Sequence, residues 1–208
     1  MMKGDGMNPD LVDEIDYMID ILTKSGFFNT DEILEILEDE FIEEDVDFSQ
    51  FNFSLNEFNN ANFSRLESVF NSLAGENIVA IHNCGYDIEE GVQDAFELYV
   101  HLRNNDFKPD GFCFYTFEDI EEAIIDGKLK ITFGDFENNE DKALEIGKTV
   151  SKYLKHEDFS INWDETINNQ IEILSFNWDK SYDDKKEFEI EGAYDNFVKG
   201  CLNEWEIS

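Results

Sequence analysis

The chain has 208 residues, of which 41% are hydrophobic and 14% aromatic, so it can build a packed core and is not an intrinsically disordered acidic protein. Fifty Asp and Glu residues against fifteen Lys and Arg give a net charge of −35 at pH 7, which excludes direct binding to nucleic acid or to anionic membranes. The same charge attracts basic proteins, although acidity also serves solubility.

The cysteines and the N-terminus indicate a compartment. Cys84, Cys113 and Cys201 lie far apart, which argues against a disulfide framework and favours a reducing cytoplasm. No apolar run reaches the roughly 18 residues of a membrane span. The first residues turn acidic where a signal peptide is basic and then apolar. We therefore expect a soluble cytoplasmic protein.

Residues 1–75 read as an acidic helical segment. Apolar residues recur at helical spacing from Pro9 to near Gly26, and Thr30 is the expected N-cap of a second helix over 31–44. A third helix is expected over 63–75. No Lys or Arg occurs from Ser25 to Ser64, where eleven residues are acidic.

Residues 76–208 alternate strand and helix patterns, with Asp87 and Thr116 as expected N-caps and Gly127 as a helix stop. The similar stretches "SINWDE" and "SFNWDK" predict two strands with Trp163 and Trp178 in equivalent places. The predicted fold is α+β, a mixed sheet with flanking helices and a C-terminal helix, preceded by the acidic segment. Strands are expected over 77–84, 112–117, 128–134, 158–166 and 171–180, and helices over 88–102, 117–127, 139–156 and 193–208.

The stretch "IVAIHNCGYDIEEG" raises the question of catalysis. His82 and Cys84 are two apart in an expected strand and would share a face, and a thiol beside an imidazole can be a nucleophile. A strand cysteine is usually inert core, however, and Gly85 and Asp87 suit the turn into a helix. The pair is thus a weak catalytic candidate, and strand, turn and helix explain the motif better.

The sequence predicts no metal or cofactor. Its histidines and cysteines show neither C-x₂-C nor H-x₃-H spacing, and H-E-x-x-H does not occur. Walker, GxGxxG and GxSxG motifs do not occur either.

Four stretches in a fixed order carry a family resemblance: "AIHNCGYDIEEG", "GFCFYTFEDIEEAIIDGKLKITFGDF", "EIGKTV" and "INWDET". The chain resembles, over about residues 76–180, an uncharacterised bacterial family of unknown function with ordered HNxGY, GFxFYxxxD, LxxxFG and WDxT motifs. Thr116 stands where that family has a polar His, and Glu165 where it tends to have Gly. The resemblance implies a fold and carries no activity.

The charge distribution favours a non-enzymatic binding protein that neutralises a basic partner, as an immunity protein does to a nuclease toxin. The segment 31–47 has no positive charge and is the expected binding surface. Six carboxylates are its predicted contact residues: Asp39, Glu40, Glu43, Glu44, Asp45 and Asp47.

Two alternatives stay open. One is a small enzyme with a pocket near the strand ends, lined by His82, Cys84, Tyr86, Tyr115 and Asp164. The other is an adaptor whose acidity only aids solubility. Labelling of the thiols discriminates the first, because a reactive Cys84 at neutral pH favours an enzyme.

Overall fold

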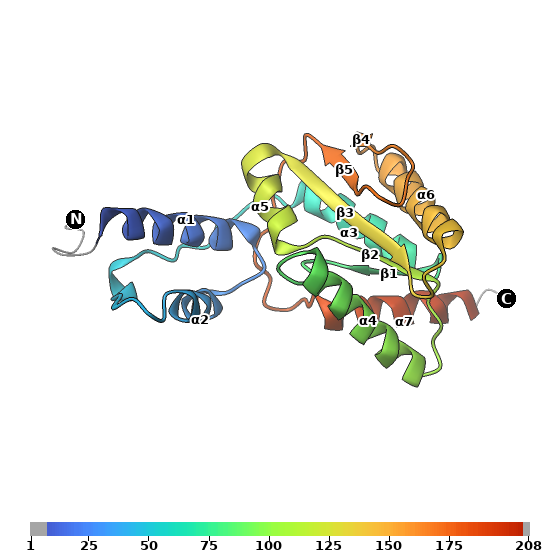
Figure 1. Ribbon diagram of the computed structural model, residues 1–208, viewed down its shortest axis with the longest axis horizontal. Coiled ribbons are helices and arrows are strands. Elements are labelled where there is room, and N and C mark those ends of the chain that lie inside the picture. Colours follow the sequence, from blue (N-terminus) through green and yellow to red (C-terminus); the bar gives the residue numbers. More distant parts are fainter. Residues whose placement is uncertain (1–7, 206–208) are drawn as a thin grey trace. The chain divides into compact units, whose positions relative to one another are not determined.

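The computed structural model describes residues 8–205, with side chains to residue 202, and its chain forms two compact units (Figure 1). Unit 1 holds the chain up to Asn60 together with Asp179–Asp184, and unit 2 holds Ala61–Trp178 and the chain from Lys185 onward. The expected division after Gly75 is placed before the third helix instead, because that helix packs against the sheet of unit 2.

Unit 1 is helical. It contains α1 (Pro9–Ser25), α2 (Thr30–Glu40) and a short 3₁₀ helix, η1 (Phe48–Gln50). The N-cap of α2 is Asn29 and not the expected Thr30: its side chain accepts hydrogen bonds from the first turn while Glu32 accepts the Asn29 N–H. The buried apolar side chains of the unit form its core: Ile15, Ile19, Ile21, Leu22, Ile33, Leu37, Phe41 and Phe48.

A lysine from late in the chain completes this small core. Gly26 ends α1 in the left-handed conformation at φ 71°, and its carbonyl accepts a hydrogen bond from the ammonium of Lys180. Lys180 is 2% exposed, and its Nζ lies 4.3 Å from the centroid of the Phe27 ring. The C-terminal end of α1 is therefore satisfied by a buried cation, which suits the negative end of the helix dipole.

Unit 2 is built on a five-stranded mixed sheet of order β1-β2-β3-β5-β4. Only β1 and β2 are parallel among its neighbouring pairs, and the other neighbours are antiparallel. The strands are β1 (Ile78–Ile81), β2 (Gly111–Phe114), β3 (Lys128–Asp135), β4 (Ile161–Asn162) and β5 (Ile171–Leu174).

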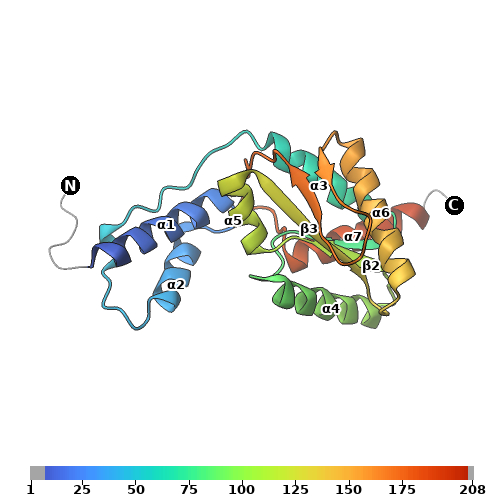
Figure 2. The same ribbon diagram turned by 45° about the horizontal axis from the view of Figure 1, so that its top comes forward.

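Five helices cover this sheet: α3 (Ala61–Ala74), α4 (Ile88–Asn104), α5 (Phe117–Asp126), α6 (Glu140–His156) and α7 (Ile190–Trp205). Figures 1 and 2 show α3 and α6 on one face and α4 on the other. Close packing makes small residues necessary on the α6 side, since a Cβ on Gly111 would lie 2.0 Å from Cδ1 of Ile146. Helix α7 contacts β1, α3 and α4, and so closes the β1 edge of the sheet.

The α+β prediction is confirmed, as are the caps Asp87 and Thr116 and the stop at Gly127. The two strands expected over 158–166 and 171–180 are present as the shorter β4 and β5, but the expectation that they carry Trp163 and Trp178 is wrong, because both tryptophans lie outside the strands. Strand β4 ends at Asn162, and the side chain of Asp164 then accepts hydrogen bonds from Thr166 and Asn169, which folds the chain into a turn.

Candidate functional site

Two regions bear on function: the acidic turn of unit 1 and a cavity in unit 2. The acidic turn comprises Asp39, Glu40, Glu43, Glu44, Asp45 and Asp47, and all six side chains are exposed. It begins with the last two residues of α2 and is anchored by two buried aromatic residues, Phe41 and Phe48, whose ring centroids are 6.4 Å apart. The carboxylates therefore face solvent because the two phenylalanines face the core.

One carboxylate of the acidic turn has a structural task. Asp47 accepts hydrogen bonds from the Ser49 N–H at 3.1 Å, the Ser49 hydroxyl at 2.6 Å and the Gln50 amide at 3.1 Å. The side-chain hydrogen bonds of Ser49 and Gln50 lower the pKa of Asp47. Among the residues that the structure describes, the side chains of the other five make no such hydrogen bond, so their charge is open to solvent.

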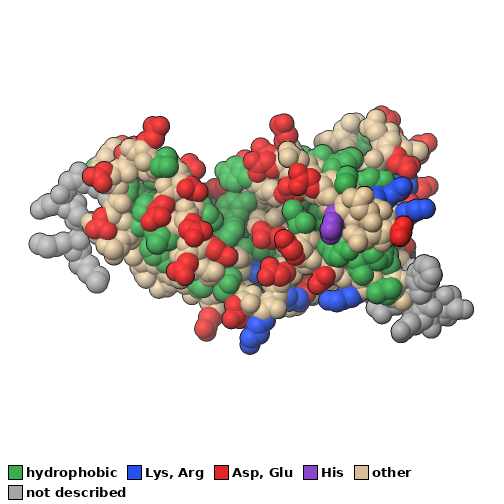
Figure 3. Space-filling view, turned by 90° about the horizontal axis from the view of Figure 1, so that it is seen from below, with side chains coloured by type: hydrophobic (Ala, Val, Ile, Leu, Met, Phe, Trp, Pro, Cys, Tyr) green, Lys and Arg blue, Asp and Glu red, His purple; other side chains and the backbone are tan. Residues whose placement is uncertain are grey.

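Cations are scarce around this turn. The basic residues that the structure describes in unit 1 are Lys24, which pairs with Asp20 at 2.6 Å, and the buried Lys180. On the face drawn in Figure 3, red carboxylates spread over the α1–α2 region and no blue side chain is visible there. Carboxylates therefore dominate this face of unit 1.

An exposed apolar residue sits inside the acidic turn. Ile42 is 75% exposed, more than the other large hydrophobic residues identified as exposed in the described chain. Burying such a side chain in a partner is favourable by about 1.5–3 kcal/mol. The turn therefore combines charge with one apolar contact point.

The motif around β1 separates His82 from Cys84. Strand β1 ends at Ile81, and Asn83 has a left-handed backbone with φ 49°, which breaks the alternation of side chains. His82 stacks on Phe70 of α3, with ring centroids 4.4 Å apart. Cys84 belongs instead to the core cluster with α4, and its thiol donates to the Gly91 carbonyl at 3.3 Å.

Both central thiols are buried and protonated. Cys84 is 1% exposed and Cys113 is fully buried, and burial raises the pKa of each thiol well above its ordinary value. A thiol that keeps its proton is a poor nucleophile. None of the three cysteines, all of which lie in the described part of the chain, forms a disulfide.

His82 is tied to a buried tyrosine. Its Nδ1 lies 2.8 Å from the hydroxyl of Tyr115, which is fully buried and whose pKa burial raises well above the usual value. The imidazole is therefore held in place by a hydrogen bond as well as by stacking.

The five residues of the expected pocket do not form one site, although Tyr115 is hydrogen-bonded to His82 and, through its backbone, to Cys84. His82 lines the cavity described next, and the other four are not among its lining residues. Tyr115 is buried beneath His82, Tyr86 is 54% exposed and stacks on Phe117, and Asp164 is exposed in the turn after β4.

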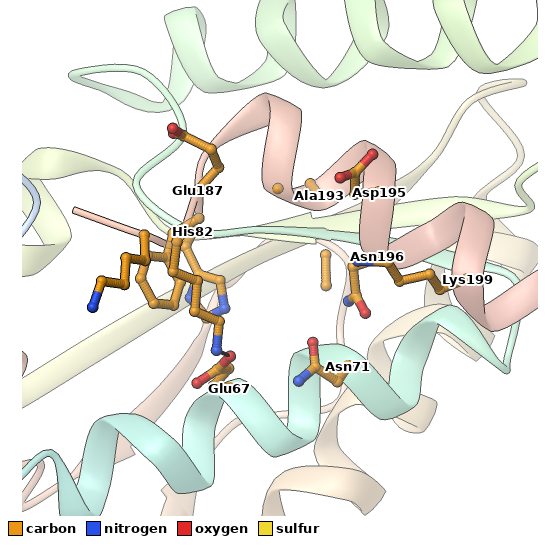
Figure 4. A pocket seen from close by; sticks show the side chains of 13 residues that line it. Glu67, Asn71, His82, Glu187, Ala193, Asp195, Asn196 and Lys199 are labelled. Atoms are coloured by element: carbon orange, nitrogen blue, oxygen red, sulfur yellow. Dashed lines mark hydrogen bonds and ion pairs between the residues drawn. The ribbon is translucent and has the colours of Figure 1, made fainter. Parts of the chain in front are cut away.

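The cavity has a volume of about 440 Å³ and lies between α3, the end of β1 and the segment that leads into α7. Figure 4 shows Glu67 and Asn71 reaching into it from α3, and Asn196 from α7, with His82 between the two helices. Small residues leave this room, because Ala80 and Ala193 stand where larger side chains would fill it.

The sequence alone did not point to most of these residues. Asn71 and Asn196 lie on helices far apart in the chain, and each looks like an ordinary surface amide. The available signal was charge: Lys185 and Lys186 are the one pair of adjacent basic residues in the sequence. They and Lys199 line the cavity.

Comparison with known proteins gives a family and no activity. The family described as "Domain of unknown function (DUF6891)" matches residues 55–182, more than half of the chain. The chain belongs to this family. The match begins after the acidic turn and ends before the lysines of the cavity. No curated protein and no solved structure matched the chain.

Membrane-spanning helices and metal-binding clusters are both absent from the described residues. No helix within 8–205 is both long enough and apolar enough to cross a membrane. The His, Cys, Asp and Glu side chains in the described part of the chain form no group of three or more that could hold a metal ion.

Proposed function

We propose that the protein is a non-enzymatic binding protein that neutralises a basic protein partner in a reducing cytoplasm, as an immunity protein does to a nuclease toxin. The observation that carries the proposal is the one-sided surface of unit 1, where exposed carboxylates crowd the acidic turn and one of the two described lysines is buried. Surfaces of one sign steer an oppositely charged partner and raise the association rate.

The acidic turn also offers a contact that charge alone does not supply. Rim charges mainly set the association rate, whereas residues buried at the centre of an interface set the dissociation rate. Ile42 stands between Glu40 and Glu43 and is 75% exposed. A basic partner with an apolar hollow would bury it, and the carboxylates would then form the rim.

Three cysteines outside disulfides are compatible with a reducing compartment. A nuclease fits the partner class because its substrate cleft is basic and binds phosphates, whose charge a row of carboxylates imitates. The partner then loses access to nucleic acid while the complex lasts.

The test is capture of a partner by the full chain at about 50 mM salt, with stepwise elution to about 500 mM, a range over which charge-driven contacts weaken by orders of magnitude. The variant reverses four charges of the acidic turn: Asp39→Lys, Glu40→Lys, Glu43→Lys and Glu44→Lys. We expect one basic protein to bind the parent chain, and the variant to bind it roughly 100-fold more weakly with a flatter salt dependence.

A matched control reverses four exposed carboxylates of unit 2, Glu97, Asp126, Glu137 and Glu145, to Lys. It changes the net charge equally but leaves the acidic turn intact, so it should retain most of the binding. An equal loss of affinity in both variants would show that binding depends on overall charge and not on the acidic turn. Unchanged affinity in the acidic-turn variant would exclude this surface.

A further inference from the structure

The cavity of unit 2 arises where two helices diverge. Helix α7 touches α3 closely at one point, since a Cβ on Gly200 would lie 2.6 Å from Cβ of Ala74. Nearer the start of α7 the helices leave about 440 Å³ between them, over a floor formed by Ala80, Ala193 and His82. These three residues are at least nine-tenths buried, so the floor belongs to the core and is not a shallow depression of the surface.

We propose that this cavity binds a small molecule through an oxyanion group, a carboxylate or a phosphate. The first argument is charge. Lys185, Lys186 and Lys199 line the cavity, so three of the fifteen basic residues of the chain gather at one place in a protein of net charge −35. Such a protein repels anions everywhere except where cations are collected.

The second argument is the direction of the side chains. Glu187 and Asp195 also line the cavity, but Figure 4 shows their carboxylates turned away from the space between the helices. Glu67 faces that space and is neutralised by an ion pair with Lys186, whose Nζ also lies 5.0 Å from the centroid of the Phe188 ring. The interior is therefore less negative than the count of lining carboxylates indicates.

The third argument is that two amides and one ammonium group in the cavity are available to bind a ligand. Asn71 and Asn196 face each other across the cavity in Figure 4, one from each helix. Within the described part of the chain neither amide makes a hydrogen bond, and Lys199 makes no ion pair. Two amides and an ammonium on opposite walls can grip an oxyanion together, and hydrogen bonds from a charged donor to an oxyanion are the strong ones.

The cavity is proposed to bind an anion, whereas the acidic turn is proposed to bind a basic protein. The two proposals are therefore independent, and each can fail without the other. Its volume fits the small-molecule range of about 300–1,000 Å³. Small-molecule sites are usually lined mostly by apolar and aromatic side chains, with polar groups at a few fixed points. The cavity matches this pattern, because its floor is buried and its walls carry a few polar side chains.

The experiment is calorimetric titration of the full chain with two probes, inorganic phosphate and succinate, at about 20 mM NaCl, where electrostatic contacts are little screened. We expect saturable one-site binding of at least one probe. Binding of phosphate alone assigns a phosphate ligand, binding of succinate alone assigns a carboxylate ligand, and binding of both assigns a general oxyanion site.

Two substitutions locate the binding. Asn196→Asp keeps the shape of the side chain but replaces an amide donor with a carboxylate, and Lys199→Gln removes the ammonium. Each should weaken binding by about tenfold or more. The control is Lys148→Gln, an exposed lysine of α6 outside the cavity, which should leave the affinity within about twofold.

Two results overturn the proposal. One is the absence of saturable heat with either probe. The other is equal affinity in the parent chain and both cavity variants, which would place the binding elsewhere. All three positions are at least partly exposed, so the variants should fold, and circular dichroism checks this.

Discussion

Lysines serve different purposes in the two units. In unit 1, Lys24 pairs with Asp20 within one helix, and Lys180 is buried against a helix end. In unit 2, lysines join separate elements: Lys130 of β3 pairs with Glu122 of α5, and Lys142 of α6 pairs with Asp110 at 3.0 Å. Ion pairs between elements offset the acidity of unit 2, whereas unit 1 leaves most of its carboxylates without such compensation.

This difference predicts which of the two units its acidity destabilises more. Like charges that are not paired repel one another and destabilise the compact state. Unit 1 is also the smaller unit, and a small domain buries a smaller fraction of its surface. We therefore expect unit 1 to open more readily than unit 2.

Thiol labelling gives the largest expected effect. In unit 2, Cys84 and Cys113 should react roughly 10³-fold more slowly than an exposed thiol, because they become accessible through opening of the core. Ser25 of unit 1 is also fully buried, so Ser25→Cys in a Cys201→Ser background reports on unit 1 with a similar side chain. We expect its thiol to react at least about tenfold faster than Cys84 and Cys113.

The measurement is the rate of reaction with an excess of a thiol reagent, followed site by site by mass spectrometry. Equal rates at the three positions would mean that the two units open together. Rapid reaction of Cys84 at neutral pH would contradict the inert thiol and revive the enzyme alternative.

The buried lysine gives the next largest effect. Lys180→Met keeps an unbranched side chain but removes the ammonium that donates to the Gly26 carbonyl. The carbonyl at the end of α1 then loses its partner, which should cost about 1–3 kcal/mol of stability. Hydrogen exchange of α1 amides should accelerate, with little change in β1 and β2. Lys148→Met, on an exposed position of α6, is the control. Unaltered exchange in α1 would show that the hydrogen bond contributes nothing net.

The smallest effect is a pair of opposite pH dependences. Burial, together with Glu97 and Glu90, raises the pKa of Asp94 in unit 2, so the folded protein holds this proton more tightly than the unfolded chain. Its contribution to stability therefore declines as the pH rises from the ordinary value of 3.8 through the higher folded pKa. Asp94→Asn should remove this decline and stabilise the protein at pH 7 by less than about 0.5 kcal/mol, since the group is partly solvated.

Asp47 of unit 1 should behave in the opposite way. Hydrogen bonds lower its folded pKa, so its contribution is present above the ordinary value and is lost as the pH falls through the folded pKa. Asp47→Asn should therefore flatten the acid side of the stability profile. Urea denaturation between about pH 3 and pH 7 measures both, and slopes of the same sign for the two variants would contradict the assignment.

Local signals in the sequence predicted most of the fold. Asp87, Thr116 and Gly127 mark helix ends through short-range chemistry, and the structure uses all three. The predictions were wrong where contacts between residues far apart in the sequence determine the local structure. Trp178 leaves the strand pattern to pack on Phe63 and Tyr115, which no local pattern shows.

The two candidate sites differ in the same way in how far the sequence predicts them. The acidic turn is one continuous segment, so its exposed charges could be found in the sequence. The cavity is assembled from residues more than 100 positions apart, among them Glu67 and Lys186. His82 was found because its motif is compact, but the left-handed backbone at Asn83 parted it from Cys84.

The late origin of Lys180 has a consequence for biosynthesis. Residues 8–60 leave the ribosome before the sheet of unit 2, yet the segment Asp179–Asp184 that belongs with them is made only after that whole sheet. During translation the carbonyl at the end of α1 has no Lys180 to bind until strands β1 to β5 have been synthesised. Unit 1 begins before unit 2 but can be completed only after the sheet of unit 2 has been made, an order opposite to the usual N-terminal-first folding of domains.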